Sequence, residues 1–238
     1  MNDTKLESEK PKKDMVAFSK PYLVLYNSVQ TAGWSYILFQ TLKFLIENRS
    51  VSGLWEVTSS SLLTFQTLAV LEVVHCILGL VKASALVTSI QVASRVIQAW
   101  GIMNPIENVH NSPTLALAII AWSISEITRY SFYCCNLLGL PSKTLTWCRY
   151  SFFMALYPAG VFSEVSNIFL ALDTIKRKQL FSLTLPNPMN ISFSFYYANI
   201  LILLSYIPLF PHLFNHMLRQ RKKVLGGESQ SENLKKSK

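Results

Sequence analysis

The chain of 238 residues is half hydrophobic and only 15% charged, and its mean hydropathy is +0.29. Because a soluble domain carries roughly 25% charged residues, a soluble fold of this composition would expose too much apolar surface. The net charge of +9 comes mainly from the two ends of the chain, which fits membrane flanks better than a nucleic-acid-binding surface, so we expect no nucleic-acid partner.

Hydropathy along the chain predicts an all-α fold, a polytopic membrane protein with a bundle of six transmembrane helices in the lipid bilayer. Each apolar segment has about 20 residues or more, the length that a helix needs to cross roughly 30 Å of hydrocarbon. We expect a tight turn at Lys82, since one continuous helix through the second and third segments would be about twice as long as a bilayer requires. The fifth segment is long and is expected to tilt, to kink at Pro158 or to lie partly in the interface. The six segments are Tyr22–Leu42, Ser61–Val81, Ala83–Met103, Thr114–Leu138, Thr144–Leu172 and Phe195–Met217.

Charge outside these segments predicts which ends face the cytosol. Residues 1–21 are expected to form a disordered cytosolic tail, residues 22–217 the transmembrane domain, and residues 218–238 a basic cytosolic tail. The tails together with Lys82 and Lys143 hold 14 Lys and Arg residues, whereas the loops on the other side hold five. The positive-inside rule therefore places both termini in the cytosol.

Several ionisable side chains fall inside the predicted helices. Since buried charges are normally paired, we expect Glu126 to bind Arg129 or Arg149, and Glu72 to bind Arg95. The fourth segment also carries a polar face at helical spacing, made of Glu126, Arg129, Tyr130 and Tyr133.

The stretch from His75 and Cys76 to Lys82 imitates a cysteine-phosphatase loop, in which a Cys and an Arg flank the residues that cradle a phosphate. Lys82 occupies the Arg position, and the residues between are apolar and predicted to be helical. We therefore expect no phosphatase activity, and we interpret His75 as a core histidine with a hydrogen-bond partner.

Tyr157 and Glu164 lie seven residues apart in the fifth segment, so both project from one helix face, about 10 Å apart along the axis. An ionisable residue at bilayer depth is costly unless it faces the protein interior, and it therefore indicates function. Residues 161–172 contain no Lys or Arg, so Glu164 has no local cation and suits proton transfer. The spacing alone leaves catalysis and proton transport open as alternatives.

Four stretches of the sequence resemble the very-long-chain (3R)-3-hydroxyacyl-CoA dehydratases, also called protein tyrosine phosphatase-like proteins. The resemblance covers roughly residues 22–225, and its most specific parts are the WxRY element and the LYP element that precedes Glu164. Lys82 stands where the family commonly carries Pro, and Phe162-Ser163 replaces a pair of small residues. The stretches are LEVVHCILGLV, EITRYSFY, LTWCRYSFFMALYPAGVFSE and SYIPLFPHLFNHMLRQRKKVL.

This resemblance implies an enzyme of the endoplasmic reticulum that removes water from a (3R)-3-hydroxyacyl-CoA to give the trans-2-enoyl-CoA, the third step of fatty-acid elongation. The family's catalytic pair maps onto Tyr157 and Glu164, and which residue moves which proton stays open. The implied partners are the acyl-CoA substrate and the other elongation-cycle enzymes, namely the condensing elongase, the 3-ketoacyl-CoA reductase and the enoyl-CoA reductase. No metal or other cofactor is expected. The residues expected to contact the substrate are Arg129, Tyr133, Lys143, Arg149 and Tyr150.

The C-terminal pair Lys235-Lys236 resembles the dilysine retrieval signal of endoplasmic reticulum membrane proteins. Two other functions stay open on the sequence. One is a transporter or proton-relay subunit that uses Glu72, Glu126 and Glu164, and the other is a non-catalytic scaffold of the elongation complex.

Overall fold

The computed structural model describes residues 3–236 except 184, 187 and 189, and it describes side chains between residues 19 and 226. This part of the chain is all-α, apart from an isolated antiparallel bridge between Leu183 and Phe193. The elements, among which η1 is a π-helix, are α1 (Asp3–Asn48), α2 (Leu54–Leu68), α3 (Leu71–Ile77), α4 (Ala85–Val96), η1 (Ile97–Met103), α5 (Glu107–His110), α6 (Pro113–Leu138), α7 (Lys143–Ser151), α8 (Phe153–Lys178) and α9 (Phe195–Lys236).

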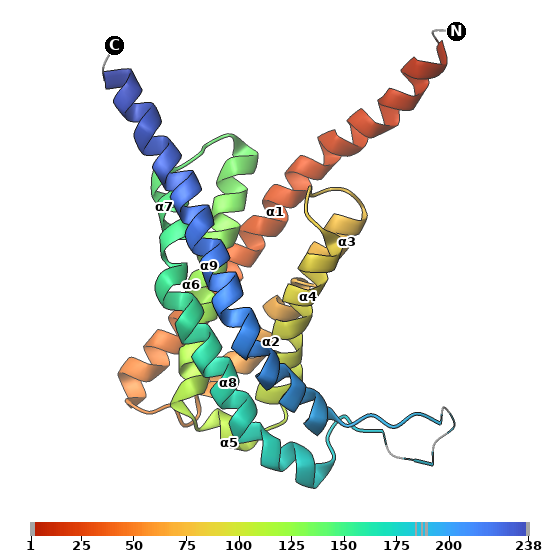
Figure 1. The fold of residues 1–238 in the computed structure, drawn as a ribbon, viewed down its shortest axis with the longest axis vertical. Coiled ribbons are helices and arrows are strands. Elements are labelled where there is room, and N and C mark those ends of the chain that lie inside the picture. Colours follow the sequence, from red (N-terminus) through yellow and green to blue (C-terminus); the bar gives the residue numbers. More distant parts are fainter. Residues whose placement is uncertain (1–2, 184, 187, 189, 237–238) are drawn as a thin grey trace.

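The helices run along the long axis of the molecule in alternating directions (Figure 1). α1 descends, α2 and α3 ascend, α4 and η1 descend, α6 ascends, α7 and α8 descend, and α9 ascends. As a result, α1 enters and α9 leaves the bundle at the same end. The α3–α4 turn and the α6–α7 loop lie at that end too, whereas α5 and the α8–α9 loop lie at the other.

Several predicted boundaries are confirmed. The tight turn at Lys82 exists, because α3 ends at Ile77, α4 begins at Ala85, and Lys82 is exposed between them. The fourth predicted segment agrees with α6 to within one residue, and the last begins at Phe195 as expected. The described residues between Ser182 and Ser194 form no helix, so they connect α8 to α9 as a loop.

Other boundaries differ from the prediction for identifiable reasons. The second helical stretch begins at Leu54 instead of Ser61, because the run of polar residues at 58–61 lowers the local hydropathy although it lies within α2. The fifth stretch is interrupted at Phe152, which separates α7 from α8. This interruption lies N-terminal to Pro158, on the side where a proline ring crowds the preceding turn. Toward the N-terminus, α1 continues back to Asp3, and the division into tails and a central domain stays a prediction.

Three stretches of described helix are long and apolar enough to cross a membrane: Leu54–Ile77, Phe153–Lys178 and Phe195–Gly226. The remaining predicted spans are shorter or more polar. α4 has 12 residues before η1 begins, and α6 contains Glu126 and Arg129. Length and composition therefore support membrane crossing by three helices, and the count of six stays a prediction.

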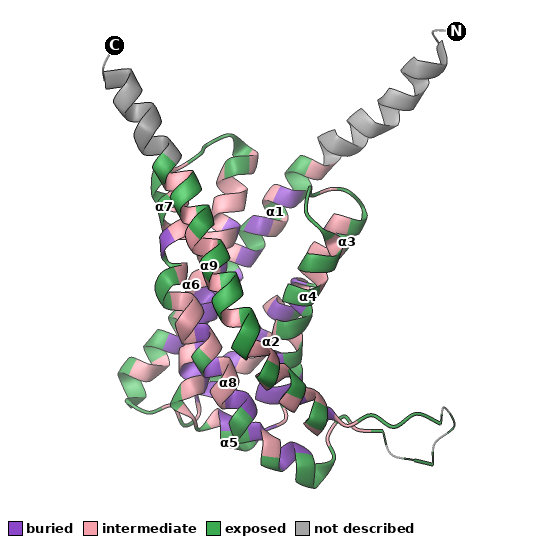
Figure 2. Cartoon of the chain, viewed as in Figure 1, coloured by how far each residue is buried: buried purple, intermediate pink, exposed green. Residues whose placement is uncertain are grey.

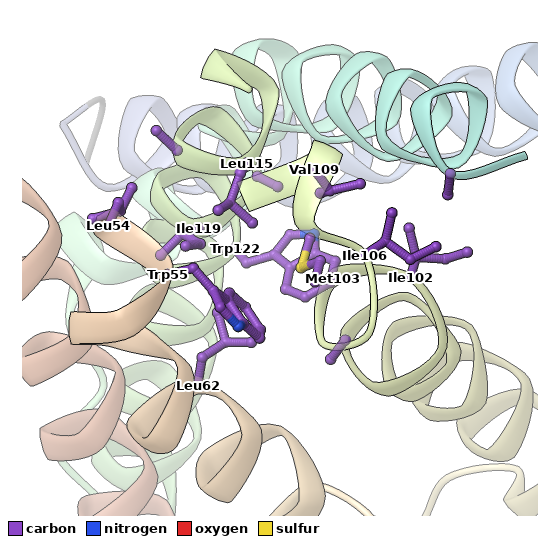
Figure 3. Close-up of a cluster of buried hydrophobic side chains, with 14 of the residues drawn as sticks. Leu54, Trp55, Leu62, Ile102, Met103, Ile106, Val109, Leu115, Ile119 and Trp122 are labelled. Carbon is purple, nitrogen blue, oxygen red and sulfur yellow. The ribbon is translucent and has the colours of Figure 1, made fainter. Parts of the chain in front are cut away.

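The buried side chains are most abundant in the half of the bundle that contains α5 (Figure 2). There, side chains from α2, η1, α5 and α6 form one apolar cluster (Figure 3). Trp122 of α6, which is 2% exposed, and Met103 of η1 both belong to this cluster. Each fully buried large apolar side chain stabilises the fold by about 1.5–3 kcal/mol.

The outer surface of the bundle is also apolar, above all along α9. Only 6% of the most apolar window of this helix is buried, and Leu201 and Ile207 are 67% and 71% exposed. A soluble monomer rarely exposes a continuous apolar surface of this kind, so the surface fits contact with lipid.

Gly33 allows α1 to lie close to α2. A Cβ atom added at Gly33 would lie 2.0 Å from the Phe65 ring. We expect Gly33→Ala to lower the free energy of unfolding by about 1–3 kcal/mol through overpacking, measured by denaturant unfolding in detergent. Gly160→Ala is the matched control, because an added Cβ there meets nothing within 4 Å, and it should be neutral or stabilising. Unchanged stability of Gly33→Ala would contradict this interpretation of the α1–α2 contact.

Candidate active site

Tyr157 and Glu164 both lie on α8, are half-buried, and face α9. The Tyr157 ring stacks on Phe210 with 5.3 Å between ring centroids and an angle of 6° between ring planes. It also stacks on Phe214 at 6.3 Å. Seven residues farther along α8, almost two helical turns, Glu164 accepts a hydrogen bond from Tyr206 of α9. The expectation that the two residues share one helix face is therefore confirmed.

The Glu164 carboxylate accepts one hydrogen bond on each oxygen. The Trp122 indole nitrogen of α6 donates to Oε1 at 2.8 Å, and the Tyr206 hydroxyl of α9 donates to Oε2 at 2.6 Å. A third donor fixes the backbone at this position, because the buried Gln98 side-chain amide of η1 donates to the Glu164 carbonyl oxygen at 2.9 Å. Three elements other than α8 thus converge on one residue.

The donors to this carboxylate are neutral groups. Within the described part of the chain, no Lys, Arg or His nitrogen forms a salt bridge with Glu164. The Tyr157 hydroxyl has no hydrogen-bond partner among the described residues, although its ring is held by stacking. The site therefore offers an anchored carboxylate and a phenol that is free to bind another molecule.

A network of buried and partly buried charges, with side chains 4–29% exposed, lies next to this site. Arg129 donates two hydrogen bonds to Glu72, at 2.6 and 2.8 Å, and its Nε donates to Glu126 at 2.8 Å. Glu126 also pairs with Arg95, and the Tyr130 hydroxyl donates to Glu72. Two arginines and two carboxylates are thus joined across α3, α4 and α6, and their formal charges balance.

The predicted ion pairs are correct in part. The pairing of Glu126 with Arg129 is confirmed. The pairing of Glu72 with Arg95 is wrong, since Glu72 binds Arg129 and Arg95 binds Glu126. The two observed pairs, Glu72 with Arg129 and Arg95 with Glu126, each join two different helices. Sequence spacing could not predict them, because it does not determine which helices are neighbours. Arg149, the other predicted partner of Glu126, lies elsewhere.

His75 is a core histidine, as expected, with 3% of its surface exposed and Tyr22 as its hydrogen-bond partner at 2.8 Å. Cys76 lies in the last turn of α3 beside Thr88. The residues after Ile77 form a turn and not the predicted helix, because Gly79 takes a left-handed conformation and closes the end of α3. No loop of backbone N–H groups surrounds the cysteine in these described residues, so the phosphatase-like string here is a helix end.

The residues expected to contact the substrate fall into two places. Arg149 donates to the Tyr133 hydroxyl at 3.1 Å and lies over the Phe132 ring, which Tyr150 also contacts. Lys143 begins α7, so these residues are found on α6 and α7. Arg129 belongs instead to the charge network.

Two surface hollows lie away from the α8 pair. One, of about 460 Å³, is lined by α9 residues between His212 and Lys222. The other, of about 630 Å³, lies where the α8–α9 loop meets the start of α9. Neither is lined by Tyr157 or Glu164.

Sequence reasoning missed Trp122, Tyr206 and Gln98. Each is a hydrogen-bond donor inside a mostly apolar stretch, and this was the signal that the sequence offered; the stretches are AIIAWSI, LLSYIPL and RVIQAWG. The two side-chain donors to the carboxylate are each 42 residues from Glu164 in the chain, so only the tertiary fold brings them together.

Comparison with known proteins identifies the family. A family model described as "Protein tyrosine phosphatase-like protein, PTPLA" matches residues 66–227, which include all of η1, α6 and α8 and most of α9, the four helices that meet at Glu164. The chain belongs to this family. The resemblance noted in the sequence is thereby confirmed.

Relatives from mammals and a nematode match most of the chain. Very-long-chain (3R)-3-hydroxyacyl-CoA dehydratase 1 of Canis lupus familiaris is 44% identical over 207 residues, 87% of this chain and 83% of the relative. Dehydratase 2 of Homo sapiens is 42% identical over 86% of this chain and 80% of its own. Dehydratase hpo-8 of Caenorhabditis elegans is 41% identical over 87% of this chain and 96% of its own. No solved structure matches the chain.

Removing Arg129 from the charge network tests its structural importance. We expect Arg129→Met to lower the free energy of unfolding by about 3–5 kcal/mol, because the change leaves Glu126 and Glu72, whose side chains are only 4% and 15% exposed, without their shared cation. Thermal unfolding in detergent measures the effect. Arg177→Ala is the control, since its pair with Asp173 is more than two-thirds exposed on both sides, and it should cost less than about 1 kcal/mol. Wild-type stability of Arg129→Met would refute the structural role of the network.

Proposed function

We propose that this protein removes water from a very-long-chain (3R)-3-hydroxyacyl-CoA to give the trans-2-enoyl-CoA, with Tyr157 and Glu164 as its acid–base pair. The observation that carries the proposal is that one face of α8 presents both the Tyr157 ring and the Glu164 carboxylate. Neutral donors from α6 and α9 hold this carboxylate in place. The dehydratase names of relatives that match 86–87% of the chain supply the reaction.

The reaction breaks the bond between C2 and its hydrogen and the bond between C3 and oxygen. The thioester acidifies the hydrogen on C2, and Glu164 takes it as a proton while the C2–C3 double bond forms. The 3-hydroxyl leaves with the proton of the Tyr157 hydroxyl and becomes water. Return of the proton from Glu164 to the Tyr157 phenolate restores both groups. The cycle transfers no electrons and consumes no second substrate.

The same residues explain why the two groups take different roles. Both oxygens of Glu164 are held by protein donors, which fixes the direction in which its remaining lone pairs point. Tyr157 is held by its ring alone, so its hydroxyl is left for the substrate oxygen. An anchored base and an unbound donor suit proton removal at C2 and protonation at the 3-hydroxyl.

We further propose that α1, α2–α3, α4–η1, α6, α7–α8 and α9 cross the membrane of the endoplasmic reticulum as six spans, with both termini in the cytosol. The alternating directions of these elements support six spans, since α1 enters and α9 leaves the bundle at the same end. The turn containing Lys82 and the start of α7 at Lys143 lie at that end, as the positive-inside rule requires. The Lys235-Lys236 side chains lie outside the described residues.

The group around Arg149 suits the CoA part of the substrate. Arg149, with Tyr133, Tyr150 and Lys143, lies on α6 and α7, where a cationic group can bind phosphate oxygens. Arg129 is already bound by two carboxylates, so we assign it to the fold. The enzymes that form and consume the intermediates, a condensing elongase and two reductases, are the proposed partners.

A proton-relay subunit fits the structure less well. A relay through Glu72, Glu126 and Glu164 needs these carboxylates to lie in one hydrogen-bonded path. Glu72 and Glu126 bind arginines, and Glu164 binds Trp122 and Tyr206. Within the described part of the chain, Glu164 therefore shares no hydrogen-bond or ion-pair partner with Glu72 or Glu126.

Replacement of the acid–base pair tests the activity. We expect Tyr157→Phe and Glu164→Gln each to lower kcat for dehydration by 10²-fold or more, on the order of a lost general acid or base. Purified protein is supplied with 3-hydroxyacyl-CoA, and enoyl-CoA formation is measured. Asp173→Asn, an exposed change on the same helix, is the control and should keep the wild-type rate. Wild-type rates in both active-site variants would sink the assignment.

Glycosylation tests the proposed topology. An acceptor sequence placed in the α8–α9 loop should be modified in microsomes, because that loop is proposed to face the lumen. The same acceptor added after residue 238 should stay unmodified. A mobility shift that endoglycosidase removes reports each outcome, and modification of the C-terminal acceptor would contradict the cytosolic placement.

A further inference from the structure

We propose that Trp122 and Tyr206 are positioning residues that clamp the Glu164 carboxylate in one orientation, with Trp122 itself fixed by Arg95. The proposal rests on the proposed dehydration by Glu164. It adds two residues from outside α8 to the reaction and connects the charge network to the site.

The clamp acts from two sides. Trp122 approaches Oε1 from α6, and Tyr206 approaches Oε2 from α9. Hydrogen bonds from opposite neighbours to both oxygens prevent rotation of the carboxylate about its last bond, because any rotation lengthens at least one of them. Gln98 holds the backbone carbonyl of the same residue, so both ends of the Glu164 side chain are fixed.

The two donors differ in whether they allow a proton on the carboxylate oxygen that they contact. An indole N–H can only donate, so Trp122 favours an Oε1 that carries no proton. A phenol can donate or accept, so Tyr206 can turn its hydroxyl and accept a hydrogen bond when Oε2 carries the proton taken from C2. The pair therefore assigns the abstracted proton to Oε2 and leaves Oε1 as an acceptor throughout the cycle.

Arg95 fixes the first of these donors. Its guanidinium carbon lies 5.5 Å from the centroid of the Trp122 ring, within the range of a cation–π contact. Arg95 is held there by Glu126, and Trp122 is packed in the apolar cluster with 2% of its surface exposed. A cation over the ring draws electron density from it and strengthens its N–H as a donor. The charge network thus acts on Glu164 through Trp122 and without a direct ion pair.

Tyr206→Phe is the first test, since it removes the donor and keeps the ring. In a purified-protein assay with 3-hydroxyacyl-CoA, we expect kcat to fall by about 10- to 100-fold, because a reacting group held loosely loses rate of this order. The KM should stay within about 2-fold, because the clamp touches Glu164 and not the substrate. Tyr197→Phe, 66% exposed on the same helix, is the control and should keep both constants.

The Trp122 donor is tested in two ways. Trp122→Phe removes the N–H and also some core volume. Incorporation of 3-benzothienylalanine at position 122 replaces the N–H by sulfur and keeps the ring shape, so it isolates the donor. Both should lower kcat as Tyr206→Phe does, whereas Trp147→Phe, 51% exposed, should not.

A second background separates positioning from general structure. Glu164→Asp withdraws the carboxylate by one methylene and so out of reach of both donors. In this background, Tyr206→Phe should cause no further loss of kcat, because the contact that it removes is already absent. An equal loss in both backgrounds would show that Tyr206 acts on the fold and would overturn the proposal.

Other outcomes are equally decisive. Wild-type kcat in Tyr206→Phe and in the benzothienyl variant would overturn the clamp, as would a change in KM alone. If the Glu164→Gln protein instead dehydrates at the wild-type rate, the proposed function itself fails. The two failures are therefore distinguishable.

Discussion

Arg129 binds Glu72 and Glu126 inside the bundle, and the position of the remaining polar groups depends on that contact. Burying these charges is favourable only if each finds a partner with good geometry, and one guanidinium with five donors can satisfy two carboxylates at once. The contact connects α3 with α6, and the second arginine, Arg95, adds α4. Three helices that have little other polar contact are thereby held in a defined relative rotation.

The neighbourhood of Glu164 contrasts with this network. The network contains full charges of both signs, while Glu164 meets an indole, a phenol and an amide. Full ion pairing stabilises a helix interface but makes a carboxylate a poor proton acceptor. The fold thus separates two uses of acidic residues by one aromatic ring, since Trp122 lies between Arg95 and Glu164. The carboxylates in ion pairs are on α3 and α6, and the one proposed to react is on α8.

Local sequence features predicted the local parts of this arrangement. α6 has clear polar and apolar signals, so its bounds were predictable, and Glu126 and Arg129 lie three residues apart on one face of it. The shared face of Tyr157 and Glu164 followed from helical periodicity in the same way. The partner of Glu72 could not be predicted from periodicity, because periodicity indicates which face of a helix a residue occupies but not which helix lies opposite. The hydrogen bonds of Trp122 and Tyr206 to Glu164 could not be predicted for the same reason, since both residues are distant from Glu164 in the chain. The interruption at Phe152 and the π-helix at 97–103 are backbone irregularities that composition does not encode.

The contact between α8 and α9 holds both the Glu164 carboxylate and the Tyr157 ring. On α9, Tyr206, Phe210 and Phe214 follow one another at four-residue spacing, and they contact Glu164 and Tyr157 along the same face of α8. α9 is also the candidate span with the smallest buried share. Separation of these two helices would remove the Tyr206 hydrogen bond from the carboxylate and the stacking partners from the Tyr157 ring in one movement. Any molecule that passed between α8 and α9 would therefore disturb the contacts of both groups at once.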